Sequence, residues 1–567
     1  MTRTFLFLSL LLCSFTFAQS VEGTWVFQSI QSPNGEDLYS VSKADTMTID
    51  STGSFLYSLE AKKLLAKGSW ELNGDRLAYS YERPSDTLRF YSITLLNDSL
   101  LRFEENETRY TFLRKNKPLA TSTIHSSSVD TTSLDQISFS GILRGLLGLA
   151  VLVLIGFLFS TNRKAIRWPL IFKGIAIQII FAFAILKVEF VKNIFDYLSQ
   201  GFVVLLSFTA AGSEFIFGSL VTDMDGFGYI FAFQVLPTIL FFSALTSLLF
   251  YFGILQKIVF AFAWIMKRTL NLSGAESLAA AGNIFLGQTE SPLLIKPYID
   301  KMTRSELLCL MSGGMATIAG GVLAAYIGFL GGDDPVQQAF FAKHLLAASV
   351  MSAPAAVVGA KLLVPETEEF NKDMTISNEK IGKNALEAIT NGTLQGIRLA
   401  VNVGAMLLVF IALIAMVNYV LSDFIGLHTG LNNWVNSFTE GQYETFTLQF
   451  ILGYTLAPLT WLMGVAKEDM ILVGQLLGEK TILNEFVAYV SLGDLKTAGK
   501  FTEEKSIIIA TYILCGFANF SSIGIQIGGI GALAPGRKTA LSELGIKALI
   551  GGTLASLFTA VIVGMLI

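Results

Sequence analysis

The sequence predicts a polytopic α-helical membrane protein that carries a small all-β domain near its N-terminus. Of its 567 residues, 52% are apolar and 15% are charged, whereas soluble domains average about 25% charged residues. The mean hydropathy is +0.57. This average hides a division, because residues 20–136 have an ordinary polar composition and the rest of the chain is strongly apolar. A second observation is a glycine-interrupted polar motif that occurs twice in the apolar part.

Residues 1–19 are predicted to be a signal peptide. Arg3 supplies a positive charge, an apolar core follows from residue 5 to 17, and a small residue, Ala18, stands near the expected cleavage site. Cys13 is not expected to carry a lipid, because Leu12 precedes it where a lipoprotein has a small residue. The leader predicts that the next domain lies outside the cytoplasmic membrane.

Residues 20–116 are predicted to form the β domain. Short runs of alternating polarity are separated by turn signals, among them Asn73-Gly74, which favours a tight hairpin. Seven or eight such runs predict a small closed barrel or a sandwich. The segment from Gly23 to Trp25 resembles the start of lipocalin-like domains, and both ligand capture and a plain spacer role stay open. The Ser/Thr-rich residues 117–136 are expected to be a flexible linker.

The membrane domain is predicted to cover residues 137–567 with eight transmembrane helices. Arg163, Lys164 and Arg167 follow the first span, so the positive-inside rule places this end in the cytoplasm. That orientation agrees with the signal peptide and leaves the N-terminal domain and the C-terminus extracytoplasmic. Residues 190–222 and 254–270 are expected to lie at the membrane interface. The expected spans are 137–160, 169–188, 226–253, 305–330, 336–363, 396–421, 503–531 and 541–567.

Two further segments, 272–299 and 468–492, are predicted to be re-entrant hairpins. Each is too short on either side of its break to cross twice, and the charge pattern makes them enter from opposite sides of the membrane. Both contain Gly, an amide, a second Gly, a Thr and a Glu in the same order, ending in Glu290 and Glu485. An inverted repeat of this kind points to a ligand site at the membrane midplane. A carboxylate deep in the bilayer costs several kcal/mol, which helix packing alone does not explain.

Composition argues against several other classes of protein. The three cysteines and three histidines stand apart from one another, so neither a metal cluster nor a disulfide framework is expected. No nucleophile–base pair is evident, and an enzyme is therefore not expected. The net charge of −4 and the lack of a basic tract argue against nucleic-acid binding.

Three motifs carry a resemblance to a known family, and they read GQTESP (287–292), LNEFVAY (483–489) and GFANFSS (516–522). Over residues 138–567 the chain resembles the concentrative nucleoside transporters. This resemblance implies eight spans, two opposed hairpins and a homotrimer in the cytoplasmic membrane, surrounded by lipid. It further implies a sodium-coupled symporter that imports nucleosides of the uridine, cytidine or adenosine type by elevator-type alternating access.

The resemblance also implies which residues form the sites. The substrate-binding set is Gln288, Thr289, Glu290 and Val322 for the base, and Glu485, Phe517, Asn519 and Ser522 for the ribose and the pocket wall. The sodium set is Asn283, Leu286, Thr317 and Ile318. The family usually has serine at position 317, and threonine keeps the hydroxyl. Sodium is therefore the expected coupling ion, with proton coupling, or a receptor that binds nucleosides without transport, as the alternatives.

Overall fold

A computed structural model gives the fold of the chain in two units, residues 1–129 and 130–567, and each is described by itself. The predicted signal peptide, including Cys13, and the predicted linker lie outside the described residues. The structure describes residues 21, 23–31, 37–39, 45–50, 54–59, 64–73, 76–83, 87–96, 100–105, 108–115, 138–222, 230–332, 334–375 and 382–567.

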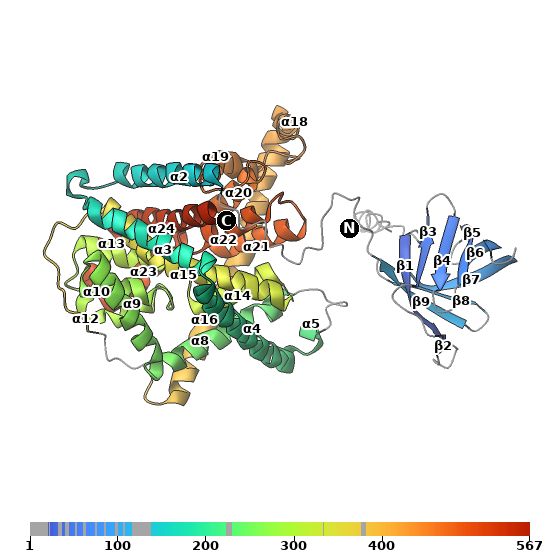
Figure 1. The fold of residues 1–567 in the computed structure, drawn as a ribbon, viewed down its shortest axis with the longest axis horizontal. Coiled ribbons are helices and arrows are strands. Elements are labelled where there is room, and N and C mark those ends of the chain that lie inside the picture. The colour runs from blue at the N-terminus through green and yellow to red at the C-terminus, as the bar shows by residue number, and fades with distance from the viewer. Residues whose placement is uncertain are drawn as a thin grey trace, which may run out of the picture. The chain divides into compact units, whose positions relative to one another are not determined.

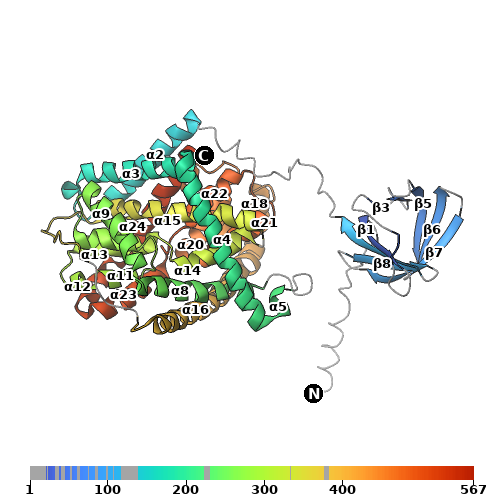
Figure 2. The ribbon, with the colours of Figure 1, turned by 60° about the horizontal axis from the view of Figure 1, so that its bottom comes forward.

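The first unit is an antiparallel meander that closes on itself (Figures 1 and 2). Strands β3 to β9 pair in chain order, and β1 pairs with β9 along its length while β3 and β2 share its other edge. Of the two predicted alternatives, the ring of hydrogen bonds corresponds to the barrel. The strands are β1 (Gly23–Gln31), β2 (Asp37–Tyr39), β3 (Thr46–Ile49), β4 (Ser54–Leu59), β5 (Leu64–Asn73), β6 (Arg76–Arg83), β7 (Thr87–Leu96), β8 (Leu100–Glu105) and β9 (Thr108–Lys115).

Aromatic side chains fill the core of this β unit. Trp25 and Phe112 are fully buried, and the Trp25 indole donates to the carbonyl of Val21 at 2.9 Å. Tyr81 and Tyr91 share a hydrogen bond of 2.9 Å between their hydroxyl oxygens. Buried and partly exposed residues alternate along β3, as a half-buried sheet requires.

The second unit consists of helices (Figure 1), and these helices differ sharply in burial. Helices α13 (Arg304–Ala316), α14 (Gly320–Gly331), α15 (Pro335–Leu363) and α24 (Lys538–Leu566) are mostly buried. Large apolar faces are instead exposed on α2 (Phe139–Leu158), α3 (Trp168–Lys187), α4 (Glu189–Phe217) and α16 (Ala385–Tyr419). Figure 2 shows α4 running obliquely across the outside of this unit.

The outer helices expose large apolar side chains, and contact of this surface with water would be energetically unfavourable. Leu408 of α16 is 72% exposed and Phe215 of α4 is 91% exposed, among many large apolar side chains. Large exposed apolar surfaces on a protein mark sites of interaction with other proteins or with a membrane. In a bilayer, lipid chains cover such a belt without cost, so the surface supports the predicted multi-pass membrane location.

Within the described ranges, eight helical stretches are long and apolar enough to cross a membrane. Seven coincide with predicted spans, and one predicted span is interrupted. The eighth, Glu189–Phe217, is one continuous helix, and its interfacial position stays a prediction. The predicted span 503–531 is divided into α22 (Glu504–Leu514) and α23 (Phe520–Leu533). The division lies at Gly516, whose φ of +100° is outside the helical region.

The remaining elements connect these helices or form the hairpins. Those around the first hairpin are α5 (Ser219–Thr222), α7 (Phe231–Gln234), α8 (Leu236–Tyr251), α9 (Ile254–Leu270), α10 (Gly274–Gly282), α11 (Ser291–Leu294) and α12 (Lys296–Ile299). Those towards the C-terminus are the π-helix η4 (Val420–Gly426), α17 (Leu427–Thr429), α18 (Leu431–Phe438), α19 (Leu448–Leu462), α20 (Met470–Ile482) and α21 (Glu485–Thr497). Two short 3₁₀ turns are η3 (Arg163–Ala165) and η5 (Pro535–Arg537).

Candidate functional site

The first hairpin is a helix, a break and two short helical turns. Helix α10 begins with a capping box, in which the Ser273 hydroxyl accepts from the Glu276 amide and the Glu276 carboxylate accepts from the Ser273 amide. The helix ends at Gly282, and the non-helical stretch up to Glu290 follows. Pro292 then stands near the start of α11, where its missing N–H costs nothing. The polar motif therefore occupies the break itself.

The second hairpin has the same plan, with a shorter break. Helix α20 ends at Ile482, and α21 begins at Glu485. The Asn484 side chain caps α21 by accepting from the Val487 amide at 3.0 Å. Glu485 is 3% exposed and occupies the first turn of α21, where the helix dipole favours a carboxylate.

Two broken helices cross where their helical hydrogen bonding stops. The first break, Thr317–Ala319, separates α13 from α14, and the second, Cys515–Asn519, separates α22 from α23. They touch at Gly516, where a Cβ would lie 2.6 Å from the carbonyl of Ala316. Only a glycine allows this close approach, so Gly516 brings the second break against the end of α13.

A chain of hydrogen bonds joins the breaks of the two hairpins. The Gln288 amide nitrogen Nε2 donates to the Ser522 hydroxyl at 3.3 Å. The Ser522 backbone amide donates to Asn519 Oδ1 at 2.9 Å, and Asn519 Nδ2 donates to Glu485 Oε2 at 2.5 Å. Four residues predicted from the motifs therefore form one connected polar cluster, although Gln288 and Glu485 lie far apart in the sequence.

Three other predicted substrate residues are packed against apolar groups. Val322 and Phe517 are buried members of one apolar cluster. Thr289 faces α23, because a Cβ at Gly529 would lie 2.7 Å from its methyl carbon.

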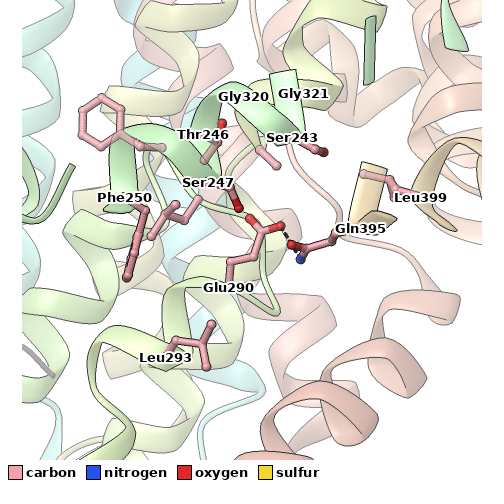
Figure 3. A pocket seen from close by; sticks show the side chains of 13 residues that line it. Ser243, Thr246, Ser247, Phe250, Glu290, Leu293, Gly320, Gly321, Gln395 and Leu399 are labelled. Atoms are coloured by element: carbon pink, nitrogen blue, oxygen red, sulfur yellow. Dashed lines mark hydrogen bonds between the residues drawn. The ribbon is translucent and has the colours of Figure 1, made fainter. Parts of the chain in front are cut away.

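Glu290 lies apart from that chain of hydrogen bonds, in a pocket between α8, α14 and α16 (Figure 3). Its Oε2 accepts from the Gly287 amide at 2.7 Å, and its Oε1 accepts from Gln395 Nε2 of α16 at 3.0 Å. Figure 3 shows Ser247 of α8 and Gly321 of α14 on other sides of this pocket. The two repeat carboxylates therefore have different surroundings.

Two residues of the predicted sodium set meet at Gly313 of α13. The Thr317 hydroxyl donates to the Gly313 carbonyl at 2.9 Å, and a Cβ at Gly313 would lie 2.6 Å from Asn283 Nδ2. Asn283 Oδ1 accepts from the Ser291 hydroxyl at 2.5 Å, whereas its Nδ2 is buried without a hydrogen-bond partner among the described residues. Leu286 and Ile318, the other two, are 3% and 2% exposed. The set thus flanks the first hairpin break and the α13–α14 break.

A buried lysine occupies the second half of the molecule. Lys480 of α20 is fully buried, and its ammonium donates to the carbonyls of Ile513 and Cys515 at 2.9 and 3.2 Å and to the Ser556 hydroxyl at 3.2 Å. These carbonyls lie where α22 ends, so the lysine satisfies oxygen atoms that the broken helix leaves free.

Sequence reasoning missed three side chains of this region. Gln526 follows Ser522 by four positions, which places both on one face of α23 and could have revealed it. Lys480 is a charge inside an apolar segment, which is a signal of function in membranes. Gln395 contacts Glu290 because α16 packs on the first hairpin, and no local sequence pattern predicts this packing.

Comparison with known proteins identifies three matching family profiles. Residues 147–220 match the N-terminus of the Na+ dependent nucleoside transporters, and residues 344–564 match their C-terminus. Between them, residues 232–333 match a profile described as nucleoside recognition. The three profiles lie within the helical unit.

Relatives of known sequence match the same unit. An uncharacterized transporter of Haemophilus influenzae is 41% identical over 430 residues, which are 75% of this chain and 98% of that protein. Sodium/nucleoside cotransporter 1 of Rattus norvegicus is 40% identical over 436 residues, which are 74% of this chain and 63% of that protein. The chain therefore spans less than two thirds of this animal relative.

A solved structure described as CNTnw in an inward-facing substrate-bound state is 37% identical. It has a TM-score of 0.67 and covers 75% of this chain and 99% of its own. A CNTnw variant in an outward-facing state gives a TM-score of 0.68. On the combined evidence of sequence and fold, the chain belongs to the concentrative nucleoside transporter family.

Proposed function

We propose that this protein is a sodium-coupled symporter that imports nucleosides across the cytoplasmic membrane. The observation that carries the proposal is the hydrogen-bond chain from Gln288 through Ser522 and Asn519 to Glu485. It joins an amide of the first hairpin and a carboxylate of the second to an amide and a hydroxyl of the α22–α23 region. A nucleoside presents a polar base edge at one end and a diol at the other, and these ends match the two ends of the chain.

Glu485, Asn519 and Ser522 are proposed to bind the ribose. A diol offers two O–H donors, and an ionised carboxylate accepts both. Asn519 adds an amide that can donate to a hydroxyl oxygen, while its own carbonyl is held by Ser522. A site built to hydrogen-bond hydroxyls rejects analogues that lack them, because its buried polar groups are then left without partners.

Gln288, Thr289 and Glu290 are proposed to meet the base. Amide, hydroxyl and carboxylate groups together can pair with the mixed donors and acceptors of a purine or pyrimidine edge. Val322 and Phe517, both buried, supply apolar contact for the ring faces. The Glu290–Gln395 hydrogen bond ties this part of the site to α16, and movement of the hairpin past α16 would break it.

Sodium is proposed to bind between Asn283, Leu286, Thr317 and Ile318 as a transported co-substrate. Backbone carbonyls freed at the two breaks, with an amide and a hydroxyl, are the hard oxygen ligands that an alkali cation needs. The buried Asn283 Nδ2 without a partner supports this assignment. If the side-chain amide of Asn283 rotates by half a turn, its nitrogen can donate to the Ser291 hydroxyl. Its oxygen then faces Gly313 and Thr317.

The energy of one sodium ion suffices for accumulation. One charge that moves down a membrane potential of about 100 mV releases about 2.3 kcal/mol. At about 1.4 kcal/mol per factor of ten, the potential alone supports roughly 50-fold accumulation of the nucleoside. A sodium concentration gradient adds to this.

The proposed mechanism is an elevator in which the two hairpins and broken helices move past the outer helices. In this arrangement the hairpins are re-entrant from opposite sides, the N-terminal β unit and the C-terminus are extracytoplasmic, and three copies form a homotrimer. The division between buried central helices and lipid-exposed outer helices supports a moving core within a fixed frame.

The test is uptake of labelled uridine, cytidine and adenosine into proteoliposomes that contain the purified protein. Saturable uptake of at least one nucleoside is expected, and absence of saturable uptake for all of them would contradict the proposal. The alternative of a receptor gives a different result, namely tight binding without flux. Deletion of residues 20–136 in the same assay shows whether the β unit contributes to flux.

A further inference from the structure

A glutamine that no motif singled out holds the base end of the site. Gln526 of α23 is fully buried. Its Nε2 donates to the backbone carbonyl of Met311 at 2.9 Å and to Gln288 Oε1 at 3.1 Å. One amide group therefore connects α13, α23 and the first hairpin.

The direction of these hydrogen bonds follows from the backbone. A carbonyl oxygen can only accept, so the end of Gln526 that faces Met311 has to be its NH2 group. The same NH2 group lies against Gln288, which therefore has to present its oxygen on that side. The NH2 group of Gln288 is then turned the other way, where one hydrogen bonds Ser522 at 3.3 Å. The polarity of both amides is thus fixed by Met311.

Packing limits the freedom of both side chains. A Cβ at Gly314 of α13 would lie 2.8 Å from Gln526 Nε2 and 2.9 Å from Gln288 Cβ. The backbone of α13 therefore lies directly against the two glutamines. Swinging either amide away requires α13 to move, which closely packed interiors resist.

We propose that Gln526 is a positioning residue that fixes Gln288 as a hydrogen-bond donor toward the ligand. The site then selects bases that present an acceptor, a carbonyl oxygen or an unprotonated ring nitrogen, to the first hairpin. This inference rests on the proposed nucleoside function and adds the polarity of base recognition to it. In a Gln526→Leu variant, Gln288 loses its partner and can turn its oxygen toward the ligand.

The experiment compares binding of adenosine with 1-, 3- and 7-deazaadenosine, in each of which C–H replaces one ring nitrogen. Uridine with 2-thiouridine and 4-thiouridine, whose sulfur is a weaker acceptor, serves if uridine is the ligand. In the wild type, loss of the recognised acceptor is expected to weaken binding about tenfold, because the Gln288 donor is left unsatisfied. In Q526L the ratio of the two dissociation constants, that of the analogue over that of the parent nucleoside, is expected to fall to about threefold or less.

A matched control is available in α3. Gln178 is fully buried, and its Nε2 donates to a backbone carbonyl, that of Gly174, at 3.2 Å. In both Gln178 and Gln526 the Oε1 atom has no hydrogen-bond partner among the described residues. Q178L is therefore expected to keep the wild-type ratio. Q526N, which keeps the amide but shortens its reach to Gln288, gives a second variant with the same expectation as Q526L.

Three outcomes overturn the inference. The first is an unchanged ratio in both Q526L and Q526N, and the second is an equal loss of affinity for adenosine and all analogues, which a structural role of Gln526 predicts. The third is a fall of the ratio in Q178L as well. Failure of the wild type to bind any nucleoside contradicts the proposed function instead, so the two failures are distinguishable.

Discussion

Replacing Glu485 by glutamine removes the negative charge from the ribose end of the proposed site while keeping the shape of the side chain. Asn519 Nδ2 still finds an oxygen to which it can donate, so the hydrogen-bond chain to Gln288 is conserved. The bound nucleoside, however, meets a neutral amide where both hydroxyls would otherwise donate to a carboxylate. We expect weaker binding of the nucleoside with little change in the fold.

The magnitude follows from the two hydroxyls. A hydrogen bond to a charged group contributes about 1.5–3 kcal/mol and one to a neutral group about 0.5–1.5 kcal/mol, so each hydroxyl loses about 1–1.5 kcal/mol. Two hydroxyls lose about 2–3 kcal/mol, which is a 30- to 150-fold rise in the dissociation constant at about 1.4 kcal/mol per factor of ten. A 2′,3′-dideoxynucleoside has neither hydroxyl and is expected to bind both proteins about equally.

Isothermal titration of the purified protein with a nucleoside and with its dideoxy analogue measures this difference. Glu479→Gln is the matched control, because Glu479 is 2% exposed in the same hairpin and accepts from Gln475 at 3.1 Å, outside the chain between the hairpins. E479Q is expected to keep the wild-type ratio between the affinity for the nucleoside and the affinity for its dideoxy analogue. If E485Q weakens the nucleoside and the dideoxy analogue by the same factor, Glu485 does not recognise the ribose and the reasoning is refuted.

Two further predictions concern the breaks in the helices. Gly516→Ala is expected to lower the free energy of unfolding by at least about 2 kcal/mol, because a left-handed φ costs an L-residue about 1–2 kcal/mol and the methyl would lie 2.6 Å from the Ala316 carbonyl. Gly524→Ala, with open space around its Cβ position, is the control, and equal melting temperatures for the two variants would contradict the account. Lys480→Met is expected to destabilise the protein by about 1–3 kcal/mol, because it leaves the Ile513 and Cys515 carbonyls without their donor. An unchanged melting temperature would show that these carbonyls need no cation.

Local patterns were enough to predict the larger elements of the fold. Long apolar runs gave seven of the eight helices of spanning length, and alternating polarity with the Asn73-Gly74 turn gave the β meander. One difference from the prediction has a physical cause. The span 503–531 looks continuous in hydropathy, because the break depends on the backbone angle at Gly516 and on its contact with Ala316.

The candidate site was predictable where motifs repeat and unpredictable where distant helices meet. Gln288, Asn519, Ser522 and Glu485 stood in recognisable motifs, and the structure joins them in one chain. Gln395 and Met311 contact the site only because α16 and α13 pack on the first hairpin. The neighbours of the two carboxylates, Glu290 and Glu485, were likewise set by packing and not by the shared pattern of the repeat.

The most direct test of the central claim is nucleoside uptake into proteoliposomes under controlled ion gradients. The membrane potential is clamped at zero with potassium and valinomycin, and the inward gradient is sodium, a proton gradient, or neither. Sodium-coupled import predicts that a nucleoside accumulates above its external concentration only with the inward sodium gradient, and that Asn283→Ala abolishes this dependence. Accumulation driven by the proton gradient alone, or equal uptake under all three conditions, would contradict sodium coupling.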